Sequence, residues 1–379
     1  MSREPESIGS KTSRRISYGN FADPFGLIWR MLSEGGRIGL STLTIEAISK
    51  IVKPLDWALQ GREQRLRESA PKSEQPIVLI VGPPRSGTTL IYQVLAKHWD
   101  VSYFTNRNAM FPRSPVSAAK LFEKSFVPPD GNYNSLYGNT SGLAGPNDGF
   151  HIWNEFFGED RYEIPDQLPE SLQISMQQLF NAWAKITQKP MLNKNNRNTV
   201  CMAALADCLP MAKFIIIERH PWFVAQSLIQ ARKWVQGSKK LGWGLGAETV
   251  QGKVDSLDYV DSVCHQVSKY HLQLQNQIAR IDPQRVFQTS YEAFCERPAQ
   301  FVQEASAWLP AIPKRDGESS ESLRPFRVSD SWKLAEEIVE RIQLRLPEPS
   351  VSNTASSSPL SGPNFGRSSH ADSQKRASL

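Results

Sequence analysis

Two short segments of the chain consist almost entirely of apolar, mostly β-branched residues. They are residues 76–81 (PIVLIV) and 213–218 (KFIIIE). A continuous apolar run of this length is typical of a strand buried on both faces, as in a parallel sheet. A helical pattern follows each run, over residues 88–99 and 222–234. Strands that alternate with helices predict an α/β fold with a central parallel sheet flanked by helices.

Weaker patterns continue this alternation along the chain. Short apolar runs predict further strands at residues 101–104, 191–193 and 286–289. Helical spacing predicts helices at residues 170–188, 199–208, 256–281, 297–309 and 330–345. These elements form one predicted domain, residues 76–346. Residues 347–379 are rich in serine and lack core-forming side chains, so we expect a disordered tail.

The N-terminal extension, residues 1–75, contains an amphipathic segment. Residues 37–60 place apolar side chains at largely helical spacing. Pro54 predicts that this helix ends or kinks near Lys53, because proline removes a backbone donor and clashes with the preceding turn. The charged residues 61–75 predict a linker.

Two interpretations of residues 37–60 stay open. The helix either packs on the main domain or lies on a membrane surface. Arg37, Lys50 and Lys53 flank the apolar face and keep the second interpretation in play, as a peripheral membrane contact.

Composition and charge argue against several classes of protein, namely nucleic-acid-binding, zinc-binding, secreted and membrane-spanning proteins. The net charge of +6 suits an anionic ligand but is too modest for a nucleic-acid-binding protein. The four cysteines show no zinc-binding spacing, which favours a reducing, cytoplasmic location. Residues 1–20 show no signal peptide, and no run of 18 apolar residues predicts a spanning helix.

The strongest chemical signal is the sequence GPPRSGTT at residues 82–89, between the first strand and its helix. The N–H groups of such a turn and the helix N-terminus together bind an anion. The spacing matches the phosphate loop of nucleotide hydrolases, except that Thr88 stands where those enzymes have lysine. The positive charge lies instead on Arg85, whose guanidinium can bind two oxygens of one phosphate or sulfate. Thr88 and Thr89 add hydroxyl donors.

A second anion site is predicted where the second strand ends. Arg219 follows that strand directly, and Ser227 lies in the next helix. Both can face the carboxyl edge of the sheet, where ligands bind in open α/β sheets. Alone, an arginine at a strand end is commonly a surface ion-pair partner. Beside the first loop, it supplies a second phosphate contact.

Together the two motifs resemble the cofactor signature of sulfotransferases that use 3′-phosphoadenosine 5′-phosphosulfate (PAPS), especially bacterial and carbohydrate-type members. The resemblance covers residues 76–310 and implies a fold like that of the P-loop-containing nucleoside triphosphate hydrolases. It implies that the 5′-phosphosulfate is held by Pro84, Arg85, Ser86, Gly87, Thr88 and Thr89. It also implies that Arg219 and Ser227 hold the 3′-phosphate. Tyr291 is similar to a tyrosine of a common superfamily segment and joins the cofactor contacts.

The implied reaction moves a sulfuryl group from PAPS to a hydroxyl, less often an amine, and leaves adenosine 3′,5′-bisphosphate (PAP). Such a transfer needs a cation at the leaving phosphate, for which the family position indicates Arg85, and a base at the acceptor. His151 and Glu155, four residues apart on a predicted helix, are the candidate bases. Lys194 resembles a lysine of several bacterial members; it lies either near the sulfate or the acceptor, or in an exposed turn without a role in catalysis. The mechanism requires no metal.

The acceptor is not named by the sequence, which leaves a carbohydrate, a lipid or a small metabolite. Four tryptophans can either pack in the core or stack on an acceptor ring, namely Trp153, Trp222, Trp234 and Trp243. Two other functions stay open. One is a P-loop kinase or nucleotide hydrolase, against which the missing lysine counts. The other is a protein that binds PAP without catalysis.

Overall fold

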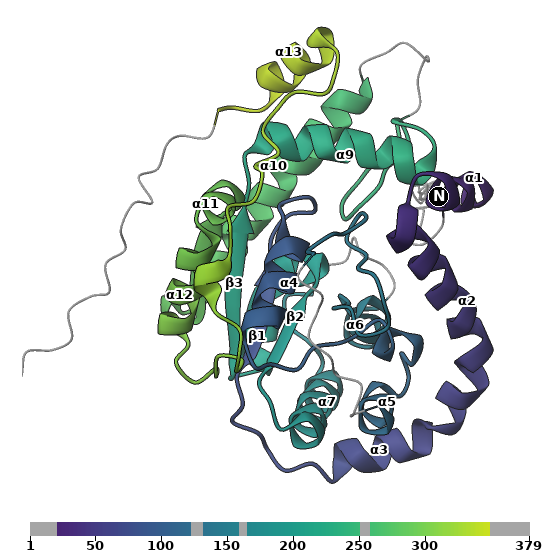
Figure 1. Ribbon diagram of the computed structural model, residues 1–379, viewed down its shortest axis with the longest axis vertical. Coiled ribbons are helices and arrows are strands. Elements are labelled where there is room, and N and C mark those ends of the chain that lie inside the picture. Colours follow the sequence, from purple (N-terminus) through teal and green to yellow (C-terminus); the bar gives the residue numbers. More distant parts are fainter. Residues whose placement is uncertain (1–20, 123–131, 159–164, 251–257, 349–379) are drawn as a thin grey trace, which may run out of the picture.

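The sheet has four parallel strands in the order β2-β1-β3-β4. The computed structural model describes residues 21–122, 132–158, 165–250 and 258–348 (Figure 1). The strands are β1 (Ile77–Val81), β2 (Met191–Lys194), β3 (Ala212–Glu218) and β4 (Val286–Ser290). Four of the five predicted strands are therefore confirmed. The fifth, at residues 101–104, is wrong, since there Ser102 makes only an isolated bridge to Met191.

The two faces of β1 are buried under different helices. Ile77, Leu79 and Val81 belong to one apolar cluster, and Val78 and Ile80 to another. The first cluster lies under α7 (Glu170–Thr187) and α8 (Met202–Cys208) and the second under α4 (Thr88–His98), α11 (Tyr291–Glu296) and α12 (Pro298–Trp308). Burial on both sides explains the continuous apolar run in the sequence. The predicted α/β fold with a flanked parallel sheet is confirmed.

The strand order creates the position for a ligand. The chain starts in the interior of the sheet at β1, pairs β2 on one side, and pairs β3 on the other. The loops that leave β1 and β3 therefore diverge at the carboxyl edge of the sheet. In open α/β sheets this switch point is where ligands bind.

Other helices complete the body of the molecule. They are α5 (Pro115–Leu121), α6 (Phe150–Phe157), α9 (Pro221–Gln236), α10 (Asp258–Ile278) and α13 (Glu336–Arg345). Two predicted helices start later than expected. The one predicted from residue 330 begins at Glu336, and the one predicted from residue 199 begins at Met202 after a short 3-10 turn, Asn196–Val200. The predicted tail, residues 347–379, lies outside the described residues from residue 349 onward.

Three consecutive helices form an N-terminal arm along one side of the molecule (Figure 1). They are α1 (Pro24–Ser33), α2 (Gly36–Ala58) and α3 (Gln60–Glu68). The predicted end of α2 near Lys53 is wrong, because the helix continues through Pro54 to Ala58. The inner face of α2 packs against Met110 and Phe111, and this tertiary contact outweighs the lost backbone hydrogen bond.

The expected linker at residues 61–75 is also wrong in its first part, which forms α3. The charged residues of this segment predict a solvated linker, but two of them are buried in the structure. Glu63 is 3% exposed and Arg67 is 8% exposed. A glutamate and an arginine four residues apart are typical of an exposed helix face. Their burial depends on partners from other elements, which the local sequence does not show.

Candidate functional site

The loop after β1 is clamped between β3 and α11. Gly87 caps α4 with a left-handed backbone (φ 89°), and a Cβ there would lie 2.3 Å from the Tyr291 ring. A Cβ on Gly82 would lie 2.4 Å from the carbonyl oxygen of Ile217. Neither position accepts a side chain, so the loop backbone lies close to its neighbours. The first turn of α4, whose N–H groups have no partners within a helix, thus opens at the carboxyl edge of the sheet.

Arg85 joins the two motifs of the sequence. Its Nε donates to Oγ of Ser227 at 2.9 Å, and its guanidinium lies 5.0 Å from the centre of the Tyr137 ring. Burial lowers the pKa of Arg85; Tyr137 offsets part of this effect, and Arg219 adds to it. The guanidinium keeps its proton because arginine does not titrate in the usual range. A partly desolvated positive charge therefore stands between the loop and α9.

The side chain of Arg219 bonds to the backbone of the first loop, residues 82–89. Its Nη1 donates to the backbone oxygen of Arg85 at 2.9 Å, and its Nη2 donates to the backbone oxygen of Ser329. The guanidinium also lies 4.6 Å from the centre of the Tyr291 ring. Its Nε is buried and has no hydrogen-bond partner among the described residues. A buried donor without a partner is costly, so this atom suits an anionic ligand.

Lys194 ends β2 at the same edge of the sheet. It is 4% exposed, and burial lowers its pKa, while Asp148 raises it and Arg85 lowers it further. A Cβ on Gly138 would lie 3.8 Å from its Nζ and 3.9 Å from Oγ1 of Thr89. Arg85, Thr89 and Lys194 therefore face one small region.

Two residues of this edge, Asn196 and Thr199, were not predicted from the sequence, whereas Asp148 was expected only to orient His151. Oγ1 of Thr199 accepts from the N–H of Gly82 at 2.9 Å and donates to its carbonyl, and Oγ1 of Thr88 donates to Asn196 at 3.3 Å. Asp148 acts on Lys194 through its charge. The polar sequence NKNNRNT after β2 was the signal for Asn196 and Thr199, because polar residues after a buried strand lie at the ligand edge.

Residues 76–310 match the model of the sulfotransferase family. The chain belongs to the sulfotransferase family. The family assignment makes it a sulfotransferase enzyme, and the range is the one over which the motifs resemble that family.

Solved structures share the fold of this sulfotransferase. The sulfotransferase STF9 from Mycobacterium avium is 15% identical, with 76% of this chain and 79% of that chain covered and a TM-score of 0.50. The sulfotransferase STF1 from Mycobacterium tuberculosis H37Rv is 12% identical, with 84% and 89% covered and a TM-score of 0.50. No curated protein matches the chain. At these identities the structures support the P-loop-like fold and nothing finer.

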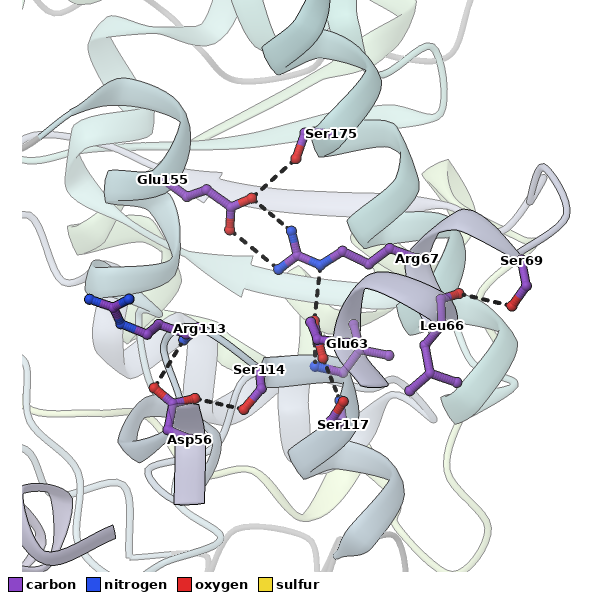
Figure 2. A network of polar contacts seen from close by, with 11 residues as sticks. Asp56, Glu63, Leu66, Arg67, Ser69, Arg113, Ser114, Ser117, Glu155 and Ser175 are labelled. Atoms are coloured by element: carbon purple, nitrogen blue, oxygen red, sulfur yellow. Dashed lines mark hydrogen bonds and ion pairs between the residues drawn. The ribbon is translucent and has the colours of Figure 1, made fainter. Parts of the chain in front are cut away.

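The two bases suggested by the sequence have different partners in the sulfotransferase. His151 is exposed on α6, with its ring 5.1 Å from that of Phe150. Glu155 turns toward the arm, where its two carboxylate oxygens accept from Arg67 at 2.7 and 3.3 Å (Figure 2). Oγ of Ser175 also donates to Glu155. Glu155 is therefore committed to an ion pair between α6 and α3.

Within the described ranges, no group of three or more His, Cys, Asp or Glu side chains is arranged to hold a metal ion. In those same ranges, no helix combines the length and the apolar character that crossing a membrane demands. All four cysteines are buried and unpaired.

Proposed function

We propose that the protein is a PAPS-dependent sulfotransferase that acts on a hydroxyl, less often an amine, of a carbohydrate, lipid or small metabolite. The observation that carries the proposal is the hydrogen bond from Nε of Arg85 to Ser227. It links the loop that suits a phosphosulfate to the helix that suits a second phosphate. A nucleotide with phosphates at both its 5′ and 3′ positions is the ligand that such a joined site would recognise.

The residues present fit this donor. The first turn of α4, with Ser86, Gly87, Thr88 and Thr89, would bind the 5′-phosphosulfate through N–H and hydroxyl donors. The 3′-phosphate would accept from the unpartnered Nε of Arg219 and from Ser227. Pro84 and Tyr291 would shape the loop rather than bind the donor by charge. When bound, PAPS supplies the sulfuryl group and a phosphate leaving group.

The donor is tested by calorimetric titration with PAP and, in parallel, with ATP and magnesium. We expect PAP to bind with a micromolar dissociation constant, about −8 kcal/mol, and ATP to give no response. We expect Ser227→Ala to weaken PAP binding about tenfold, since it removes one hydrogen bond to a charged group. Binding of ATP alone would support a P-loop kinase or hydrolase instead. PAP binding without turnover on any acceptor would support a non-catalytic binder.

For the base we propose Asp148 in place of Glu155, with His151 as the competing candidate. Asp148 acts electrostatically on the buried Lys194, and its backbone oxygen accepts from Asn195 at 3.2 Å, beside that lysine. His151 is exposed on the following helix. We propose that this carboxylate, whose charge raises the pKa of Lys194, takes a proton from an acceptor held near that lysine.

The two candidates separate by mutation. We expect Asp148→Asn to lower kcat about 10²- to 10⁴-fold, because it removes the base, and to leave PAP affinity within a few-fold. His151→Gln should change kcat less than about threefold. The reverse pattern in steady-state kinetics would return the role to His151.

We also propose a peripheral contact of the arm with an anionic lipid surface. The outer side of α1 and α2 exposes apolar side chains, with Phe25 at 85%, Trp29 at 70% and Ile51 at 75% exposure. Arg37 and Lys53 are exposed on the same arm. Tryptophan beside basic residues is typical of helices at a membrane interface. A cytoplasmic location stays a prediction.

Vesicle co-sedimentation tests this contact with full-length protein. We expect binding to vesicles that contain phosphatidylglycerol, and at least about tenfold weaker binding by the double variant Trp29→Ser, Ile51→Ser. The matched control replaces Leu272 and Leu344, exposed leucines outside the arm, with serine. Equal binding by both double variants, or none by the wild type, would remove the arm as a lipid contact.

A further inference from the structure

Residues 136–139 form a tight hairpin turn. The turn lies beside the region that Arg85, Thr89 and Lys194 face, which is called the transfer site below. The N–H and C=O groups of Leu136 and Asn139 bond to each other at 2.9 and 3.0 Å, and the two residues between them, Tyr137 and Gly138, have φ values of 49° and 97°. Two left-handed residues in a two-residue loop form a type I′ turn, whose first position favours Asn, Asp or Gly. A tyrosine there is strained. Backbone strain of this kind is concentrated at functional sites, which points to a role for the Tyr137 side chain.

The two central residues of the turn, Tyr137 and Gly138, lie beside the side chains that face the transfer site. Gly138 lies beside Lys194 and Thr89, at the distances given above. The ring of Tyr137 covers the guanidinium of Arg85, whose other contact is Ser227. The face of an aromatic ring carries negative charge density, so it attracts and orients a guanidinium. The ring and Ser227 thus hold Arg85 from two sides.

The outer face of Tyr137 is held in turn by two tryptophans. Its ring stacks on Trp234 of α9, with centroids 4.7 Å apart and planes 24° apart. Trp243 meets the same ring edge-on at 6.1 Å. Both tryptophans are only partly buried, and Trp243 also packs against the apolar cluster that includes Val224 and Val263.

Trp234 is held by residues in and next to α1, a helix that lies outside the residues matched by the family model. The indole Nε1 of Trp234 donates to Oε2 of Glu34 at 3.1 Å, and its backbone oxygen accepts from Nε of Arg30 at 2.6 Å. The N–H of Ala22 donates to Gln236, two residues further on. Ala22, Arg30 and Glu34 all precede residue 76, where the family match begins. A chain of contacts therefore runs from α1 through Trp234 and Tyr137 to Arg85.

We propose that Tyr137 is a positioning residue that orients the Arg85 guanidinium toward the transferring sulfuryl group, and that α1 sets its position through Trp234. This inference rests on the proposed function. With Nε bonded to Ser227 and one face on Tyr137, the guanidinium cannot rotate freely. Its two terminal nitrogens are then kept in one orientation, which lowers the cost of organising the charge when transfer occurs.

The test of Tyr137 uses transfer to water, which needs no identified acceptor. The bond from sulfur to the phosphate oxygen of PAPS breaks, a bond from sulfur to the water oxygen forms, and the protons of water pass to solvent. With enzyme in excess over PAPS, we expect Tyr137→Leu to slow sulfate release about five- to thirtyfold, the range of a partly desolvated cation–π contact. Tyr137→Phe keeps the ring and should stay within about twofold. PAP affinity should change less than about threefold in both variants.

The outcomes separate this inference from the function it rests on. Failure of the wild type to bind PAP would overturn the proposed function. Normal PAP binding with wild-type sulfate release by Tyr137→Leu would overturn the role of Tyr137 alone. An equal loss in Tyr137→Phe would assign the effect to the hydroxyl and contradict positioning by the ring. Wild-type enzyme that binds PAP but releases no sulfate would also overturn the proposal, since Arg85 would then have no transfer to serve.

The part played by α1 is tested by a double-mutant cycle on the same reaction. Glu34→Ala should slow sulfate release about two- to fivefold, because the indole loses its hydrogen-bond acceptor. In a Trp234→Phe background, which has no indole N–H, Glu34→Ala should have no further effect. Glu46→Ala, an exposed carboxylate of α2, is the matched control and should leave the rate unchanged. Additive effects of Glu34→Ala and Trp234→Phe would contradict coupling through the indole.

Discussion

Arg85→Ala is expected to lower kcat for sulfuryl transfer by at least about 10³-fold. In a loose, in-line transfer the protein contributes mainly charge neutralisation, and removal of a transferring-group arginine typically costs 10³ to 10⁵ in rate. Arg85 is the loop's own positive charge, and it occupies the place between α4 and α9 where the donor would bind. Its pKa is lowered by burial, a sign that water screens it less than a surface arginine.

The matched variant is Arg85→Lys, which keeps the charge but not the two-nitrogen fork. We expect it to recover part of the rate, about tenfold over Arg85→Ala. Sulfate transfer is measured under saturating PAPS, with thermal unfolding as the check that each variant is folded. Turnover by Arg85→Ala within tenfold of the wild type would contradict the mechanism. Loss of PAP binding without loss of kcat at saturation would make Arg85 a binding residue only.

Arg67→Met is expected to destabilise the fold by about 3–5 kcal/mol, the usual cost of removing one partner from a buried ion pair. Arg67 lies between two carboxylates, donating from Nε to Glu63 at 2.9 Å and from Nη1 to Glu155 at 2.7 Å (Figure 2). Burial works against its charge, yet the two carboxylates more than compensate and raise its pKa. Without Arg67, Glu63 stays buried with only the N–H groups of Val116 and Ser117 as donors.

Denaturant unfolding monitored by tryptophan fluorescence measures this effect. The control is Arg65→Met, an exposed arginine of the same helix, which should change the free energy of unfolding by less than about 0.5 kcal/mol. Glu155→Gln should lower stability in the same direction while leaving kcat within about twofold, since the Glu155 carboxylate is paired with Arg67 of the arm. A large loss of kcat in a folded Glu155→Gln variant would restore Glu155 as a candidate base.

The sheet and the loop could be predicted because local sequence determines them. A run such as IVLIV must be buried on both sides to be stable, and this requires helices on both faces. The glycines at 82 and 87 mark backbone positions where a side chain would collide with neighbours. The predictions that failed involve residues whose environment is not local. Pro54 lies within a helix held by tertiary packing, and the charged run at residues 61–75 begins with a helix whose polar pair is buried.

The parallel sheet and the glycine-bounded turn at residues 82–89 follow from the sequence, because each depends on spacing along a strand, turn or helix. The pairing of that turn with Arg219 and Ser227 was implied by the resemblance to a family, and which charges meet depends on tertiary packing. This packing turned Glu155 toward Arg67 and brought Asp148 into electrostatic contact with Lys194. It also placed Tyr137 on Arg85 and linked Tyr137, through Trp234, to α1 near the N-terminus. Contacts between residues so far apart leave no periodic pattern, since they depend on where separate elements pack.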